Sequence, residues 1–307
     1  MKTSIAYWFK KFLFAGILFL NFSQIPCHGY GLVDQNGCPG LPLRRLMVAI
    51  GGDENWNLAT INSHLEKNFF QCSRRNGEQL CNLMEELQWE DLEPIFHEMG
   101  MIDAIRPLAS HYHYLIIFGE SIPLMRMQLQ FIRELQNANQ VYFDRVIFLE
   151  NWQESSDTTN GIEKKMKGEH DAAKNLLKEY FPRGTVPWKI ISKNPRRQDG
   201  AIHQWLKSRP KAASALMVGS NPYIFSQLEP LRGALKQCGW FQRKGSLDFC
   251  GNGMIDVYGD ANRIFILMNG VARTLREEMN NRKCNDATLP NGKNNLKNIS
   301  SPTNSGP

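Results

Sequence analysis

The chain has 307 residues, of which 21% are charged, and its formal net charge is +6 at pH 7. This length accommodates one large α/β domain or two small domains. The charge is modest and no Lys/Arg run carries interleaved aromatic residues, so we expect no nucleic-acid partner.

The first 29 residues predict a segment for export. Lys2, Lys10 and Lys11 flank the start of a nine-residue apolar run at 12–20. A basic start with so short an apolar core is typical of a secretory signal, since a membrane span needs about 20 residues. We expect cleavage near Cys27 and a periplasmic or secreted chain whose net charge, without those three lysines, falls from +6 to +3. The alternatives are an uncleaved membrane anchor at 12–20, which would be the chain's membrane contact, and lipidation of Cys27, although small residues are missing before it.

Six cysteines follow the signal segment, and an even number in an exported chain permits disulfides. The pairs closest in sequence are Cys72 with Cys81 and Cys238 with Cys250. The spacing does not define the pairing, and buried reduced thiols are the alternative. No CxxC motif occurs, so we predict no zinc site.

Residues 30–110 predict a helical leader segment. The apolar run 46–50 fits a short strand or a helical turn, and the residues 51–55 indicate a turn. Between 80 and 105 apolar residues recur at helical spacing, but Pro94 and Gly100 interrupt the pattern. We therefore expect two short helices there rather than one long helix.

From 111 to 279 apolar strand patterns alternate with helical patterns. Continuous apolar runs are typical of strands covered on both faces by helices. The predicted strands are 114–118, 145–149, 187–191 and 215–218, with short candidates near Leu247 and Ile255. The last helix is expected to begin near Ala261. This order predicts an α/β fold, a three-layer sandwich with a mainly parallel, Rossmann-like sheet. Residues 280–307 have few apolar residues and predict a disordered tail.

The loop after the first predicted strand is the first candidate for a binding site. Gly119, Glu120 and Ser121 open a helix whose backbone amides can hold an anion. Glu120 can act as a general base or contact a ribose hydroxyl, or it can be a solvated acid of the turn. Neither GxGxxG nor GxxxxGK[ST] occurs, so the dinucleotide and P-loop motifs are absent.

Later loops supply further candidates, each with a simpler structural alternative. Glu169 and His170 open the second helix, where acids also stabilise a helix dipole without any site. Arg197 lies in the loop after the third strand, where a guanidinium can clamp a phosphate or carboxylate. Ser220 and Asn221 follow the fourth strand; Asn221 can hydrogen-bond a ligand or cap the next helix.

Ligands of parallel sheets bind beyond the carboxyl ends of the strands. We therefore expect seven residues to converge at that edge: Gly119, Glu120, Ser121, Glu169, Arg197, Ser220 and Asn221.

The order of GES after the first strand, GEHDAAKNLL, NPRRQDGAIHQWL and SNPYIFSQ resembles a family of α/β envelope proteins of unknown function that includes SanA, ElyC and YdcF. The resemblance covers roughly 111–279. It implies a role in envelope or peptidoglycan-related processes and a small anionic or nucleotide-like ligand. The chain departs from the family where Asp199 or Gly200 replaces a usual Thr, and where the His and Arg of the fourth loop are missing. These departures leave open binding without catalysis.

Three function classes follow. The first is an exported α/β domain that binds or acts on a small anionic or phosphorylated ligand. The second is a metal-assisted hydrolase that uses Glu120, Glu169 and His170. The third is a secreted interaction protein that has lost its active site. The sequence does not define the reaction, the catalytic residues or a cofactor.

Overall fold

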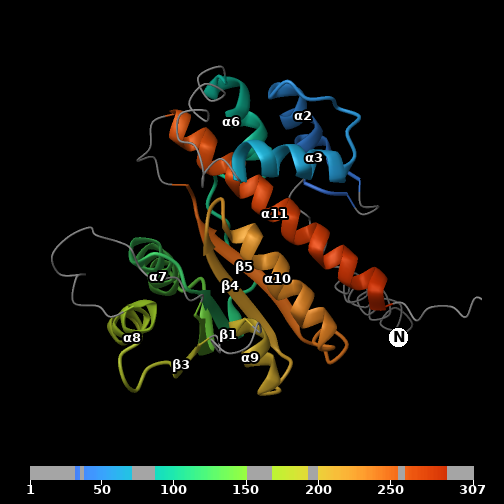
Figure 1. The fold of residues 1–307 in the computed structure, drawn as a ribbon. Helices are drawn as coiled ribbons and strands as arrows, with labels where there is room; N and C mark the ends of the chain where they lie inside the picture. The colour runs from blue at the N-terminus through green and yellow to red at the C-terminus, as the bar shows by residue number, and fades with distance from the viewer. Residues whose placement is uncertain are drawn as a thin grey trace, which may run out of the picture.

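The computed structural model describes residues 32–34, 38–70, 87–150, 168–192, 200–254 and 260–288. Within these residues the chain forms a five-stranded sheet in which all neighbouring strands are parallel. The strands lie in the order β3-β2-β1-β4-β5 (Figure 1). Their bounds are His111–Phe118 (β1), Tyr142–Leu149 (β2), Trp188–Ile191 (β3), Ser214–Ser220 (β4) and Ser246–Asn252 (β5).

This sheet confirms the predicted α/β fold with a Rossmann-like, parallel sheet. The four strands predicted from apolar runs are adjacent members of it, and the candidate near Leu247 is β5. The candidate near Ile255 lies outside the described residues. Parallel strands covered on both faces must be apolar on both faces, which explains why unbroken apolar runs identified them.

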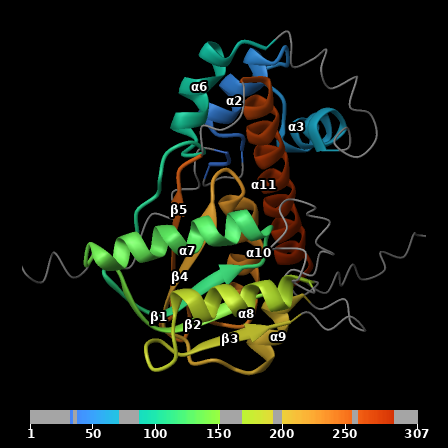
Figure 2. The same cartoon turned by 90° about the vertical axis from the view of Figure 1, so that its left-hand side faces the viewer.

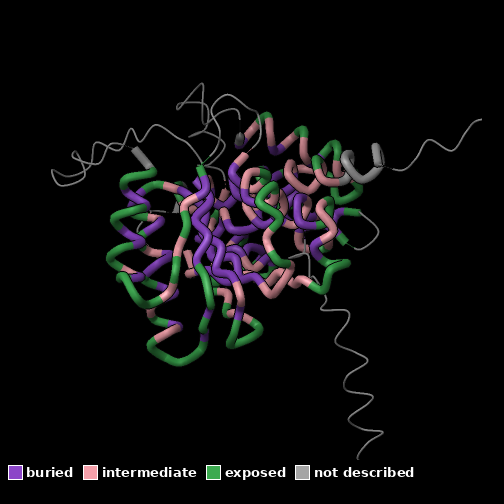
Figure 3. The backbone as a smooth tube through the Cα atoms, turned by 90° about the horizontal axis from the view of Figure 1, so that it is seen from below, coloured by how far each residue is buried: buried purple, intermediate pink, exposed green. Residues whose placement is uncertain are grey.

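Helices cover both faces of the sheet. One face packs against α7 (Ile122–Asn137) and α8 (Gly168–Tyr180), which lie together in front of the sheet in Figure 2. The other face packs against α9 (Ala201–Lys207) and α10 (Ile224–Gln237). Side chains of β1 alternate between the two cores, with Leu115 and Ile117 towards α7 and Tyr114 and Ile116 towards α10. Figure 3 shows the buried strands between helices whose outer sides are exposed.

The leader segment and the last helix extend the core beyond the sheet. The leader contains α2 (Leu41–Ala49), α3 (Leu58–Leu65), a π-helical turn η1 (Glu66–Phe70) and α6 (Trp89–Glu98). α3, η1 and α6 pack against the long α11 (Asp260–Thr288), and α2 packs against α6. α11 also lies along α10 (Figure 1). Buried leader residues such as Phe69 and Phe96 share one apolar cluster with Leu267 and Met268 of α11. The leader is therefore continuous with the core of the α/β domain.

Two boundaries differ from the sequence predictions. Residues 46–49 belong to a helix, α2, so of the two alternatives predicted for 46–50 the helical one is confirmed. Pro94 lies inside α6 instead of interrupting it, because burial of Leu92, Ile95 and Phe96 on one side outweighs the lost backbone hydrogen bond. The last helix continues beyond 280 to Thr288, and Asn281 Nδ2 donates to the Glu229 carbonyl of α10 at 2.7 Å. The part of the predicted tail from 289 on, like the signal segment, lies outside the described residues.

The two cysteines Cys238 and Cys250 are free thiols, so the structure contains no disulfide between them. They cannot pair because the sheet separates them: Cys238 borders the core on the α10 side, whereas Cys250 of β5 belongs to the core under α7. Cys72 and Cys81 lie outside the described residues. None of the helices described here is long and apolar enough to span a membrane.

Candidate functional site

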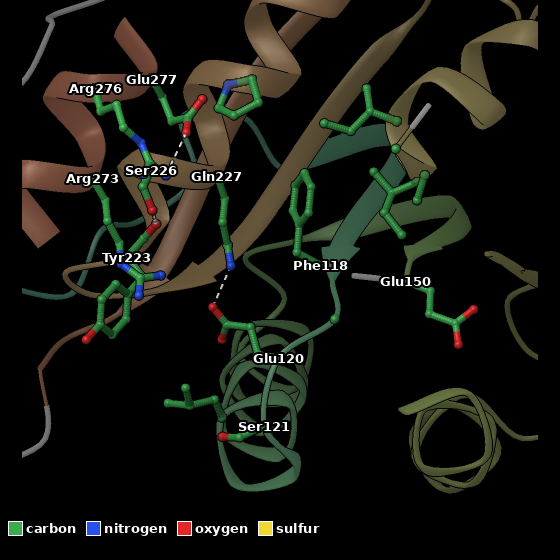
Figure 4. Close-up of a pocket in the computed structure, with 17 residues that line it drawn as sticks. Phe118, Glu120, Ser121, Glu150, Tyr223, Ser226, Gln227, Arg273, Arg276 and Glu277 are labelled. Atoms are coloured by element: carbon green, nitrogen blue, oxygen red, sulfur yellow. Dashed lines mark hydrogen bonds and ion pairs between the residues drawn. The ribbon is translucent and has the colours of Figure 1, made fainter. Parts of the chain in front are cut away.

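The strand order reverses between β1 and β4. The chain leaves β1 towards α7 on one face and leaves β4 towards α10 on the other face. In open parallel sheets this arrangement leaves a crevice beyond the strands' carboxyl ends, where ligands bind. A cavity of about 620 Å³ lies at this point (Figure 4). We call it the crevice; residues from β1, β2, α7, α9, α10 and α11 line it.

Glu120 is held between the two faces of the sheet. Gln128 Nε2 of α7 donates to Glu120 Oε2 at 2.7 Å. Gln227 Nε2 of α10 donates to Glu120 Oε1 (Figure 4). Gln128 is fully buried. Amide donors on both oxygens fix the orientation of the carboxylate. Glu120 is therefore a positioned hydrogen-bond acceptor at the crevice rather than a mobile surface acid.

Ser121 places the amino end of α7 at the crevice. It is the N-cap residue of this 16-residue helix, and its side chain makes no capping hydrogen bond. Pro123 occupies the first turn and contributes no N–H group. The remaining free amides of the first turn carry the positive end of the helix dipole, which favours an anion nearby. Gly119, Glu120 and Ser121 all line the crevice, as the position after β1 requires.

A second carboxylate, Glu150, was not among the candidates from the sequence. In Figure 4 it lies on one side of Phe118, and the side chains of α10 and α11 lie on the other side. Glu150 directly follows β2, lines the crevice and is only 4% exposed. Its Oε2 lies 3.4 Å from Nδ1 of His170 on α8, and Ser192 Oγ lies 3.5 Å from the same nitrogen. The pair has the composition of a general acid and base. Glu150 comes directly after a predicted strand, and this position is the same feature of the sequence that identified Glu120.

Among the described residues, the cations that line the crevice come from α11. Arg273 and Arg276 are three residues apart, and both line the crevice. The Arg273 guanidinium lies 5.4 Å from the centre of the Tyr223 ring, and Arg276 contacts Glu277 at 3.4 Å (Figure 4). Spacing of three places two helical residues on one side. That spacing was visible in the sequence, but the side of α11 that faces the sheet's edge was not.

A buried asparagine orients Arg273. Asn269 Oδ1 accepts a hydrogen bond from Arg273 Nε at 2.7 Å, and Asn269 Nδ2 donates to the Phe69 carbonyl of the leader at 3.2 Å. Asn269 is 3% exposed. One side chain thus connects the leader backbone to a cation of the crevice.

The residues after β4 occupy a different place from the one expected. Asn221 Nδ2 donates to the carbonyls of Asp103 at 2.6 Å and Gly100 at 3.3 Å. Ser220 and Asn221 are buried, and neither lines the crevice. Asn221 therefore attaches the end of the leader to the sheet, and Tyr223, Ser226 and Gln227 of the following helix face the crevice instead.

Two predicted residues cannot be placed. Arg197 lies outside the described residues, and the side chain of Glu169 is not described although its backbone begins α8. Gly200, at the end of the same loop as Arg197, lines the crevice. Within the described part of the chain, no three His, Cys, Asp or Glu side chains gather as a metal site.

Comparisons with protein-family models, with curated proteins and with solved structures find no match to this chain. The resemblance to the envelope family stays a prediction from the motifs.

Proposed function

We propose that this chain binds a small ligand that carries both an anionic group, such as a phosphate, and hydroxyl groups, and that it does so in the cell envelope. The observation that carries the proposal is the composition of the crevice. Two guanidinium groups of α11 and the amino end of α7 line the same cavity as a carboxylate fixed by two amides.

The two kinds of group suit two parts of one ligand. Arg273 and Arg276 offer forked N–H donors, which match phosphate or carboxylate oxygens. Glu120 is acceptor-only when ionised, so it selects a hydroxyl or amine of the same ligand. A lone anion such as inorganic phosphate would be repelled by Glu120 and Glu150, and an uncharged sugar would leave the guanidinium groups unused.

The envelope location rests on the basic, apolar segment at the amino terminus and on the motif order shared with the envelope family. It supports a ligand such as a nucleotide sugar, which combines phosphate and hydroxyl groups; a polyprenyl phosphate is the apolar comparison.

The test is a thermal-shift panel on the purified chain with nucleotides, nucleotide sugars, S-adenosylmethionine and polyprenyl phosphates. A ligand at 100 times its dissociation constant stabilises the folded state by about 2.7 kcal/mol. The Arg273→Gln variant should lose about ten- to a hundredfold in affinity for any ligand found, because a charge-assisted hydrogen bond contributes about 1.5–3 kcal/mol. Arg183→Gln, an exposed arginine outside the crevice, is the matched control. Equal affinity of both variants would contradict the proposal.

A second candidate function is hydrolysis of the bound ligand. The observation that favours it is the contact between buried Glu150 and His170 at the crevice. In this function Glu150 or His170 removes a proton from the attacking water. Release of phosphate or another product from a panel ligand, lost in Glu150→Gln with binding retained, would separate hydrolysis from binding alone.

A further inference from the structure

A second cavity lies at the amino edge of the sheet, away from the crevice. Its volume is about 430 Å³. Tyr114, Ile147 and Trp205, each at most 3% exposed, form its floor, and the more exposed Arg145, Lys189 and Lys211 belong to its rim. We call it the amino-edge cavity. Its described lining residues come from β1, β2, β3, α9 and the segments next to them.

The strand pattern explains why this cavity exists. Along β2, Leu149 and Ile147 are buried on the α9 side, and the next position on that side is Arg145. Along β3, Ile191 is buried and the corresponding position is Lys189. Two positions where a covered strand would place apolar residues are therefore cationic.

The covering helix is too short to bury these positions. α9 has seven residues and ends at Lys207, so it spans about 10 Å, whereas the eight-residue β2 spans about 26 Å. The amino ends of the strands extend beyond the helix, and their α9-side residues line an open cavity instead of a core.

The described lining of the amino-edge cavity carries positive charge. It contains Arg145, Lys189 and Lys211, and none of the described lining residues is Asp or Glu. Within the described residues none of the three forms an ion pair with a carboxylate. The nearby acid, Asp144, accepts instead from His111 at 3.0 Å and His113 at 2.8 Å. Three cations from three segments thus border this cavity, and no carboxylate of the described residues lines it.

The floor of the amino-edge cavity is aromatic and uncharged. Tyr114 and Trp205 contact each other edge to face with ring centres 5.6 Å apart, and both line the cavity. Burial raises the pKa of Tyr114, against the opposing effect of Arg145, so its phenol remains neutral at physiological pH. The floor suits an apolar or planar group, and the rim suits an anion.

We propose that the amino-edge cavity binds a small organic phosphate with a planar body, of the nucleoside monophosphate class. The phosphate is held by Arg145 and Lys189 with Lys211, and the planar base lies against the aromatic floor. The volume is in the range of ligand pockets that enclose molecules of this size. The site is separate from the crevice and does not depend on the function proposed there.

The test uses the whole purified chain and isothermal titration calorimetry with the four ribonucleoside 5′-monophosphates, with nucleosides and with inorganic phosphate as fragments. A monophosphate should bind more tightly than either of its fragments. Arg145→Gln and Lys189→Gln should each weaken this binding about ten- to a hundredfold, as expected for loss of a charge-assisted contact. Both side chains are exposed, so the variants should fold, and unchanged melting temperatures verify this.

Two controls separate this site from the rest of the surface. Arg183→Gln and Lys174→Gln remove exposed cations that line neither cavity, and both should leave the affinity unchanged. Any one of three results would overturn the proposal. These are that no monophosphate binds, that inorganic phosphate alone binds equally well, or that binding is lost in Arg273→Gln but not in Arg145→Gln.

Discussion

Replacing Asn221 by Ala tests whether this residue stabilises the fold or binds a ligand. The change removes two hydrogen bonds to the carbonyls of Asp103 and Gly100. A lost bond costs about 1 kcal/mol, and a buried carbonyl left without a donor costs about 1–3 kcal/mol. Part of this is offset because Asn221 Oδ1 is itself buried without a partner. We expect the free energy of unfolding to fall by about 1–3 kcal/mol.

The assay is urea unfolding, with thermal melting as a second measurement. A loss of 1 kcal/mol lowers the melting temperature of a 150–250-residue domain by about 2–4 °C, so we expect a decrease of about 2–12 °C. The affinity for a crevice ligand should not change. Asn137→Ala, at the exposed end of α7, is the control and should stay within about 0.5 kcal/mol of the parent. An unchanged melting temperature combined with lost ligand binding would refute this reasoning and return Asn221 to the binding site.

Three further predictions concern packing, pH and export. Gly219→Ala should lower the free energy of unfolding, measured in urea, by about 1–3 kcal/mol, because its added Cβ would lie 2.7 Å from Ile224 Cγ1. Gly200→Ala is the control and should be nearly neutral, because no described atom lies within 4 Å of its added Cβ. Hydrogen bonds from two neighbouring histidines lower the pKa of Asp144. The contribution of Asp144 to stability is therefore present above its pKa in the unfolded chain, and it is lost as the pH falls through its lower pKa in the folded chain. The stability difference between the parent and Asp144→Asn should therefore shrink as unfolding is measured from pH 5 towards pH 3; a difference that grows in acid would have the wrong sign. If the chain is exported, amino-terminal sequencing should find a mature chain that begins near residue 30. Met1 intact on soluble cytoplasmic protein would contradict export, and Met1 intact in a membrane fraction would indicate the uncleaved anchor.

The sequence predicted those features that depend on local pattern. β1 and β4 were recognisable because both faces of each are buried, and Glu120 was recognisable because it follows β1. Features set by contacts between distant segments were not predictable. Asn221 also follows a strand, but only the approach of residues 100–103 decides that it contacts the leader rather than a ligand.

The position of the crevice cations also depends on contacts between distant segments, so the sequence did not predict it. An apolar stripe predicted α11, but the direction of Arg273 depends on how α11 packs against α10 and the leader. Glu150 was missed for another reason: it comes directly after the predicted strand 145–149 and was not singled out, and only the pairing of its backbone N–H with the Ile191 carbonyl at the end of β3 shows how the sheet holds it.

Asn269 contacts both the leader and Arg273, so the leader should contribute to ligand affinity. A shortened chain that begins at His111 would keep the sheet and Glu120, but Asn269 would lose its acceptor at Phe69 and α11 would lose the helices packed around it. Arg273 would then sample more rotamers, and the ligand would bear the entropy cost of ordering it. Amino-terminal truncation should therefore weaken binding at a cavity that none of the described leader residues lines, and a minimal domain for functional work should retain the leader.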